Sequence, residues 1–278
     1  MPLLSCRVVG TLVNRTVARA GQQNRRFPDP GGAKLDPCAR PRAVTVLVQA
    51  QFAAKHRDFR RAGIVIKPTK STTKETPTAR SRRVWDKIAP SYDAKISFAE
   101  RAQFGGGREW VCSRATGSVL EVAIGTGRNL AFYPEGVSIT GLEMSPAMLA
   151  IARKRAADLG VQAELVEGDA QQLPFDNASF DTVLCALSLC TIPDHATAIA
   201  EMARVLKPGG TLLLLDHVGS RWWPVWAVQR FIEIFTSRSG EYMTRRPLPM
   251  LAAAGLRVTE SAQLKLGTVE RVAAVKLG

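Results

Sequence analysis

From about residue 83 to the C-terminus, short apolar runs alternate with segments whose apolar residues recur every three or four positions. The short runs have the length of buried strands, and the longer spacing is typical of helices. Strands that alternate with helices usually form a parallel sheet with helices on both faces. The pattern therefore predicts an α/β fold with a doubly wound, seven-stranded, mostly parallel sheet, its strands at 118–122, 138–142, 163–167, 180–187, 211–217, 256–263 and 269–276.

Two of the predicted helices have clear start signals. Ser145 is placed to cap the first helix, and Pro146 suits its first position because proline needs no partner for a backbone N–H there. Asp194 is placed to cap the second. The inward face of the first helix should contain Met148, Leu149, Ala152, Ala156 and Leu159 before Gly160 ends it, and that of the second Ile199, Met202, Ala203 and Leu206.

Charge divides the chain into two parts. Residues 1–83 hold 18 Lys+Arg against 4 Asp+Glu, whereas residues 84–278 hold 20 against 20, so the whole net charge of +14 lies in the N-terminal part. Prolines and glycines interrupt that part, which cannot bury enough apolar surface to fold alone. We expect residues 1–80 to be a basic, largely disordered extension, locally helical around 43–61, and residues 81–278 to be the folded domain.

The role of the basic extension stays open at this level. It could tether the protein to anionic surfaces, act as an organelle-targeting leader, or be an upstream extension without selected structure. The five cysteines, Cys6, Cys38, Cys112, Cys185 and Cys190, form no CxxC pair, and the three histidines are scattered. We therefore expect no metal site and a reducing, cytoplasmic location. No apolar run reaches the ~18 residues of a membrane-spanning helix.

The segment 119–130 holds the strongest chemical signal. A buried strand is followed by small residues at Ala123, Gly125 and Gly127, which allow a tight turn and close approach to a ligand. Glu143 follows about twenty residues later, where a carboxylate can accept hydrogen bonds from ribose hydroxyls. Leu130 replaces the third glycine of a dinucleotide site, and Glu121 would repel a pyrophosphate. The turn therefore favours a nucleoside ligand that carries positive charge.

These residues resemble motif I of the class I S-adenosylmethionine-dependent methyltransferases, with Ala123 in place of the first glycine of the usual acid-x-Gly-x-Gly-x-Gly. The segments 168–175, 179–183 and 203–211 are similar to the later motifs of that family, in the same order. The resemblance covers about residues 85–278. It implies a Rossmann-like methyltransferase domain with S-adenosylmethionine as cofactor.

The resemblance also assigns residues to the cofactor. In the family, the acid that matches Asp169 binds the adenine amino group, its neighbour Ala170 lies beside the ring, and a tyrosine matching Tyr92 lies over the cofactor. Glu121, Glu143 and Asp169 also end three consecutive predicted strands, which brings them to one edge of the sheet independently of the resemblance. The cofactor-binding residues expected in this way are Tyr92, Glu121, Ala123, Gly125, Gly127, Glu143, Met144, Asp169, Ala170 and Ala186.

The acceptor of the methyl group is expected near the segment after the fifth strand. Three of the five tryptophans, Trp222, Trp223 and Trp226, lie there, and the family selects its acceptors in this region. Such a cluster suits a flat hydrophobic ligand or a membrane interface, where arginines at 221, 230 and 238 could meet lipid phosphates. It could also be a purely structural lid. We expect Cys190, Trp222 and Trp226 in the acceptor pocket.

Methyl transfer from a sulfonium is an in-line displacement, so the enzyme mainly positions its substrates. Tyr92 and His217 are the candidate catalytic residues, His217 because imidazole accepts a proton near neutral pH. The chain looks similar to quinone-biosynthesis, phosphatidylethanolamine and alkyl-thiol methyltransferases. This resemblance implies a hydrophobic small-molecule or lipid acceptor and allows peripheral membrane contact.

The alternative function is a nucleic-acid methyltransferase or binding protein that uses the basic extension. Two features oppose it: residues 84–278 carry no net charge, and no Asn/Asp-Pro-Pro-Tyr/Phe motif follows the fourth predicted strand. The sequence leaves the oligomeric state open.

Overall fold

The computed structural model describes residues 75–278, apart from the side chains at 98–99, 101–102 and 239. The predictions for the basic extension up to residue 74, for the local helix around 43–61, and for Cys6 and Cys38 lie outside the described residues.

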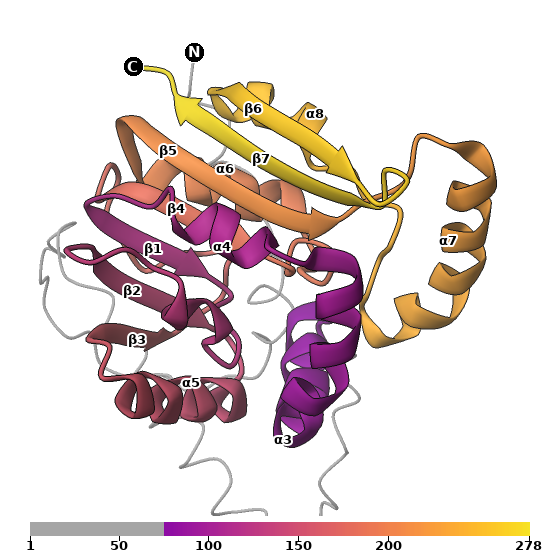
Figure 1. Ribbon diagram of the computed structural model, residues 1–278, viewed down its shortest axis with the longest axis horizontal. Coiled ribbons are helices and arrows are strands. Elements are labelled where there is room, and N and C mark those ends of the chain that lie inside the picture. The colour runs from indigo at the N-terminus through magenta and orange to yellow at the C-terminus, as the bar shows by residue number, and fades with distance from the viewer. Residues whose placement is uncertain (1–74) are drawn as a thin grey trace, which may run out of the picture. The chain divides into compact units, whose positions relative to one another are not determined.

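The sheet has the predicted seven strands. Its spatial order is β3-β2-β1-β4-β5-β7-β6, with β1 to β5 parallel and β7 antiparallel to both β5 and β6 (Figure 1). The fold class predicted from the alternation is therefore confirmed. The strands are β1 (Ser118–Val122), β2 (Ser138–Glu143), β3 (Ala163–Glu167), β4 (Phe180–Ala186), β5 (Leu206–His217), β6 (Leu256–Leu264) and β7 (Val269–Lys276).

One strand begins earlier than predicted. The sequence predicts that the fifth strand starts at residue 211, but β5 begins at Leu206. Leu206 already pairs with Phe180 of β4, and the register then shifts so that Thr211 faces Thr182. The glycine and proline residues between them form an irregularity inside the strand. Leu206 therefore contributes to the sheet and not, as predicted, to the face of the preceding helix.

Helices cover both faces of the sheet. Val119, Leu184 and Leu213 pack with the short helix α4, and Ile139 on the same face packs with α5. The opposite face, which includes Leu120, packs with α6. The α-helices are α3 (Pro77–Phe104), α4 (Gly107–Cys112), α5 (Pro146–Leu159), α6 (His195–Val205), α7 (Trp223–Thr236) and α8 (Leu248–Leu251), with 3-10 turns η1 (Arg128–Ala131), η2 (Ser237–Ser239) and η3 (Ala252–Ala254). Within the described part of the chain, no helix is long and apolar enough to cross a membrane.

The predicted capping residues take their places. The Ser145 side chain accepts a hydrogen bond from Met148 N at 3.2 Å, Gly160 ends α5 in the left-handed conformation, and Asp194 caps α6 through Thr197 N. One residue of the predicted inward face is different. Leu159 is the last residue of α5 and is 45% exposed.

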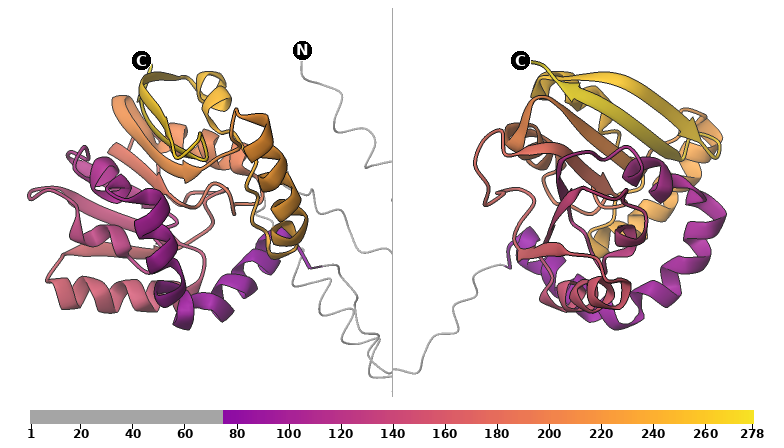
Figure 2. Two further views of the ribbon diagram at one scale, coloured as in Figure 1. Left: turned by 45° about the vertical axis from the view of Figure 1, so that its right-hand side comes forward. Right: turned by 60° about the vertical axis from the view of Figure 1, so that its left-hand side comes forward.

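The long helix α3 lies beyond the carboxyl ends of β1 and β2, and α7 lies beyond the end of β5 (Figures 1 and 2). α3 begins at Pro77, a little before the predicted domain boundary at residue 80. The Thr76 side chain caps it by accepting from Ala79 N, and Arg83 pairs with Glu75 at 2.9 Å. These contacts favour a domain boundary before Glu75.

We predict that residues 1–74 are dispensable for folding and that the first turns of α3 are not. A chain that begins at Glu75 should keep the melting temperature of the full protein, because it retains the Thr76 cap. A chain that begins at Trp85 should melt several degrees lower, because it lacks that cap and the buried Ser81. Thermal unfolding of both truncations tests this. Equal loss of stability in both would show that the basic extension packs on the domain.

Candidate active site

Three residues of the turn after β1 have the left-handed backbone conformation, which glycine adopts most easily. Ala123, Gly125 and Gly127 have φ values of 56°, 60° and 77°. No atom lies within 4 Å of a side chain built at Gly125, so this glycine leaves open space. A side chain at Gly127 would lie 2.9 Å from Leu130 and 3.2 Å from the Ala152 backbone. Gly127 therefore allows α5 to pack closely, whereas Gly125 faces open space.

Ala123 and Leu187 hold the left-handed conformation without being glycine. Their φ values are 56° and 57°, and they follow the neighbouring strands β1 and β4. For a residue with a side chain this conformation costs about 1–2 kcal/mol. The Ser188 hydroxyl lies 3.4 Å from the Ala123 carbonyl oxygen, which links the two strained turns. Such strain is common where a fold shapes a binding site.

Glu143 ends β2 with its carboxylate held by backbone groups. One oxygen accepts a hydrogen bond from Gly125 N at 3.0 Å, and the other accepts from Ser145 N at 2.9 Å. Burial raises the pKa of Glu143, and the backbone N–H groups oppose that effect. The carboxylate therefore has a fixed position, and its remaining lone pairs can accept hydrogen bonds from a ligand.

Glu121 is the second buried carboxylate at this edge of the sheet. Its oxygens accept hydrogen bonds from Asn129 Nδ2 at 2.8 Å and from the Tyr133 hydroxyl at 2.7 Å. Burial raises the pKa of Glu121 to about 7, against the lowering effects of Tyr133, Arg108 and Asn129. The side chain is 2% exposed and forms no ion pair within 4.0 Å among the described residues. A positively charged ligand group would stabilise its ionised form.

Three acids on α3 fasten the helix to this edge. Asp86, Asp93 and Glu100 are seven residues apart, which places them on one side of the helix. Asp86 Oδ1 accepts from the Ser145 hydroxyl at 2.6 Å and lies 3.3 Å from Ala147 N, at the start of α5.

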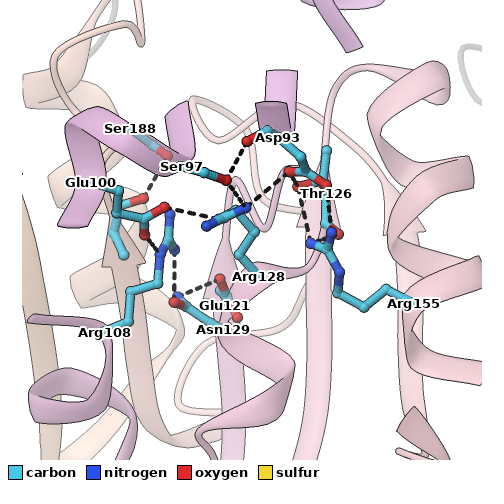
Figure 3. A network of polar contacts seen from close by, with 11 residues as sticks. Asp93, Ser97, Glu100, Arg108, Glu121, Thr126, Arg128, Asn129, Arg155 and Ser188 are labelled. Carbon is cyan, nitrogen blue, oxygen red and sulfur yellow. Dashed lines mark hydrogen bonds and ion pairs between the residues drawn. The ribbon is translucent and has the colours of Figure 1, made fainter. Parts of the chain in front are cut away.

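Asp93 and Glu100 extend the same polar network along the glycine turn (Figure 3). Asp93 accepts from the Thr126 hydroxyl at 2.8 Å and pairs with Arg155. Glu100 pairs with Arg108 and lies 2.9 Å from Arg128 Nε. Arg108 in turn donates to Asn129 Oδ1 at 2.8 Å, and Asn129 donates to the Glu121 carboxylate. Helix α3 is thereby connected to the carboxylate at the end of β1.

An aromatic pair on α3 forms a wall of the site. The rings of Trp85 and Tyr92 meet edge to face with their centroids 5.9 Å apart, and both residues line the same cavity. Burial raises the pKa of Tyr92, so its hydroxyl stays protonated at neutral pH. Tyr92 can therefore donate a hydrogen bond or pack against a ligand, and it does not act as a base.

A cavity lies at the carboxyl ends of β1, β2 and β4. Most of the residues expected at the cofactor line it: Tyr92, Glu121, Ala123, Gly125, Glu143, Met144, Ala170 and Ala186. Residues that the sequence reasoning missed also line it, among them Ser81, Trp85, Arg108, Thr126, Leu187 and Ser188. The sequence already placed Tyr92 of α3 at the cofactor, and the seven-residue spacing of acids, next to an aromatic pair with the same spacing, is the signal that could have added the other residues of α3.

Two expected cofactor residues do not line the cavity. Gly127 packs against α5, as described above. The Asp169 carboxylate accepts from Gln171 N at 2.9 Å and lies 2.9 Å from Gln171 Nε2, while its neighbours Gly168 and Ala170 face the cavity. The expected acceptor residues Cys190, Trp222 and Trp226 lie outside the cavity lining as well. Cys190 is buried, and the two tryptophans are 55% and 41% exposed.

His217 is the last residue of β5 and does not line this cavity. Its ring and the side chains of Cys190 and Asp216 have their ligand atoms within 4.8 Å of one another, a grouping that the sequence did not suggest. Asp216 accepts hydrogen bonds from the backbone N–H groups of Ser188, Cys190 and His217. Burial raises the pKa of the Cys190 thiol well above its ordinary value. We therefore interpret Asp216 as the residue that holds the loop after β4.

Comparison with known proteins agrees with this geometry. Residues 120–214 match the model of the family described as a methyltransferase domain. A phosphatidylethanolamine N-methyltransferase of Cereibacter sphaeroides is 35% identical over 126 residues, which are 45% of this chain and 62% of that protein. A demethylmenaquinone methyltransferase of Thermus thermophilus is 33% identical over 143 residues, 48% of this chain and 64% of that protein. The match therefore spans slightly less than two thirds of each relative.

The chain is similar over this region to the class I S-adenosylmethionine-dependent methyltransferases. The resemblance noted in the sequence is confirmed, and solved structures share the fold. An S-adenosylmethionine-dependent methyltransferase from Thermotoga maritima has a TM-score of 0.54 at 22% identity and covers 70% of this chain and 99% of its own. The cyclase SpnF has a TM-score of 0.58 at 18% identity and covers 73% and 97%. Because a cyclase shares the methyltransferase fold, the fold alone does not define the reaction.

We predict that replacing the strained Ala123 by glycine stabilises the protein by about 1 kcal/mol, because relief of the left-handed strain exceeds the entropy that glycine adds to the unfolded chain. Ala157→Gly, at an exposed position of α5, is the matched control and should destabilise by about 1 kcal/mol. Urea unfolding of both variants measures the two effects. A loss of stability in Ala123→Gly equal to that in Ala157→Gly would contradict the interpretation.

A second prediction concerns Glu121. The folded chain binds a proton at Glu121 more tightly than the unfolded chain, so this group's contribution to stability is complete below about pH 4.5 and is lost as the pH rises to about 7. Glu121→Gln cannot ionise and should be more stable than the parent at pH 8, with little difference at pH 5.

The same substitution should weaken S-adenosylmethionine binding about tenfold at pH 8, because the ligand's positive charge loses its buried counter-charge. In the parent, affinity should rise with pH through about 7 as Glu121 ionises, and in Glu121→Gln this rise should disappear. Calorimetric titrations at several pH values measure it. An identical pH profile in both proteins would remove Glu121 from cofactor recognition.

Proposed function

We propose that this chain transfers a methyl group from S-adenosylmethionine to a hydrophobic small molecule or lipid, such as a quinone-like ring, a phospholipid amine or a thiol. One observation carries the proposal: two buried carboxylates, Glu121 and Glu143, line one cavity beside an open glycine backbone. A nucleoside with hydroxyls and a positively charged tail offers both carboxylates partners, whereas a phosphate would be repelled.

The residues present fit this cofactor at three points. Glu143, fixed by two backbone N–H groups, is placed to accept hydrogen bonds from ribose hydroxyls. Glu121 would be the counter-charge to the positively charged amino acid tail. Gly125 leaves room for the backbone to approach the ligand. Ala170 and Met144 line the cavity beside these groups and suit the adenine ring. When bound, the cofactor supplies an electrophilic methyl group on sulfur.

The chain's own contribution to the reaction is mainly positional. The polar network from Asp93 and Glu100 to Asn129 holds α3 against the glycine turn. Trp85 and Tyr92 of the same helix form one wall of the cavity. An in-line displacement depends on the relative orientation of donor and acceptor, so a rigid wall can provide much of the rate enhancement. Its aromatic surface also excludes water from the reacting atoms.

The acceptor class rests on the cavity lining and on the relatives. Trp85, Leu142, Met148 and Ile192 give the cavity an apolar character, and the two relatives described above are named for a phospholipid and for a quinone precursor. Cys190, Trp222 and Trp226 stay proposals for acceptor contacts outside the described cavity. We keep a cytoplasmic location as part of the proposal, consistent with the unpaired Cys112, Cys185 and Cys190.

His217 remains the candidate base for acceptors that must lose a proton. Its Nε2 is buried, has no hydrogen-bond partner among residues 75–278 and lies 3.9 Å from Glu241 Oε1. Two acids lie beside the ring: Glu241, and Asp216, whose Oδ1 lies 3.5 Å from Nδ1. Because His217 does not line the cavity, we expect it to matter only for an acceptor that reaches the loop after β4.

The experiment that tests the function offers labelled S-adenosylmethionine to the protein with four acceptors: phosphatidylethanolamine, a demethylated quinone, an alkyl thiol and duplex DNA. Label should enter one of the three hydrophobic acceptors and not DNA. Glu143→Ala should lower cofactor affinity by about 1.5–3 kcal/mol, the scale of a hydrogen bond to a charged group.

Glu164→Ala is the matched control, since Glu164 is an exposed acid on the neighbouring strand β3. It should leave both cofactor affinity and label transfer unchanged. Transfer of label to DNA would favour the nucleic-acid alternative. Unchanged affinity in a folded Glu143→Ala variant would exclude Glu143 from the cofactor site.

A further inference from the structure

Helix α7 has its polar residues inside and its apolar residues outside. Its two buried residues are Gln229 and Glu233, only 5% and 7% exposed. In contrast, large apolar side chains face solvent along its length: Trp223 is 75% exposed, Phe231 63% and Phe235 57%. A surface helix normally has the opposite arrangement. The exposed apolar side chains of this helix and the residue before it are Trp222, Trp223, Trp226, Val228, Phe231, Ile232, Ile234 and Phe235.

The two buried polar residues fix this orientation. Gln229 and Glu233 are four residues apart and so lie on one side of the helix. The Gln229 amide accepts from Ser220 N at 2.8 Å and donates to the Val218 carbonyl at 2.8 Å. Glu233 accepts from the N–H and the hydroxyl of Thr244, each at 2.7 Å. Rotating α7 to bury its aromatic side would leave these groups without partners, so the apolar side stays outward.

The exposed apolar surface continues onto a second element. The tip of the β6–β7 hairpin holds Leu266, which is 68% exposed, in a left-handed conformation with φ 58°. The Ser220 hydroxyl donates to the Leu266 carbonyl at 2.6 Å and so holds the tip at the start of α7. Figures 1 and 2 show α7 at the margin of the molecule beside this hairpin, with one side directed away from the sheet.

The charges around this surface are mainly positive. Between residues 221 and 246 there are five arginines against two glutamates, and one of these glutamates is the buried Glu233. Arg221, Arg230 and Arg238 are exposed, as is Lys265 at the hairpin tip. Aromatic side chains beside arginine and lysine are the composition that suits the interface of an anionic bilayer.

We propose that α7 and the hairpin tip form a docking surface for an anionic phospholipid membrane. The inference rests on the proposed function in one respect: α7 lies beyond the carboxyl end of β5, so docking would bring the cavity's side of the molecule to the phase in which a lipophilic acceptor dissolves. Insertion of the aromatic side chains removes apolar surface from water, and the cationic rim meets lipid phosphates.

The test uses the full chain and vesicles of phosphatidylcholine, alone or mixed with phosphatidylglycerol. The parent should bind the mixed vesicles, and its tryptophan emission should be quenched by lipids with brominated acyl chains. The double variant Trp223→Ser/Phe231→Ser should bind about tenfold or more weakly, because two interfacial aromatic groups are lost. Phe132→Ser/Leu159→Ser, at two exposed apolar positions elsewhere, is the matched control and should bind like the parent.

A charge variant, Arg221→Gln/Lys265→Gln, should weaken binding to the mixed vesicles and not to phosphatidylcholine alone. Three results would overturn the proposal. Unchanged binding of the aromatic variant would assign binding to the basic residues 1–74 alone. A marked fall in its melting temperature would show that the aromatic groups pack within the protein. Conversion of a parent dimer to a monomer in sedimentation would make α7 a contact between copies.

The proposed function can fail separately. Cofactor affinity, measured without vesicles, should be equal in the parent and the aromatic variant, because neither substituted residue lines the cavity. A parent that binds vesicles but not S-adenosylmethionine would sink the proposed function and leave the docking surface. A parent that binds the cofactor but not vesicles would contradict the docking surface and leave the proposed function intact.

Discussion

Two carboxylates buried at one edge of the sheet set the conditions for the rest of this site. Burial of an ionised acid costs several kcal/mol unless hydrogen bonds or opposite charges offset it. Neither Glu121 nor Glu143 forms an ion pair within 4.0 Å among the described residues, so their surroundings must supply hydrogen bonds instead. The conformation of the glycine turn, the start of α5 and the position of Asn129 all serve that requirement. These hydrogen bonds offset only part of the cost of burying the two carboxylates, and a cationic ligand would offset the rest.

This requirement also explains why α3 belongs to the domain and is more than a preceding helix. Arg108 supports Asn129, and Glu100 of α3 supports Arg108, so the charge balance of the site extends into the helix. Asp86 caps the start of α5 with a side chain from α3. The carboxyl ends of β1 and β2 and the helix α3 are therefore joined by one polar network. A change that loosens α3 should be felt at the ends of β1 and β2.

The sequence predicted the parts of the molecule that depend on local patterns. All seven strands, the Ser145 and Asp194 caps and the turn at Gly125 follow from periodicity, capping and glycine chemistry. What it missed depends on distant partners. The position of Asp169 is set by Gln171, whose amide also contacts Thr78, and the orientation of α7 is set by Gln229 and Glu233 binding to segments outside the helix. For this aromatic cluster the sequence left three readings open: a flat hydrophobic ligand, a membrane interface or a structural lid.

The strand order has a consequence for how copies of this protein can meet. β3 and β6 are the two edges of the sheet, where unpaired backbone groups could recruit another strand. β3 is only five residues long and exposes Glu164 and Glu167, and β6 has a register shift near Thr259 with exposed charges at Arg257 and Glu260. Short, charged and irregular edges resist strand addition. In the part of the chain that the structure describes, both ends of the sheet are thus protected against edge-to-edge aggregation, although a net charge of only +2 (23 Lys+Arg against 21 Asp+Glu) acts there to keep copies apart.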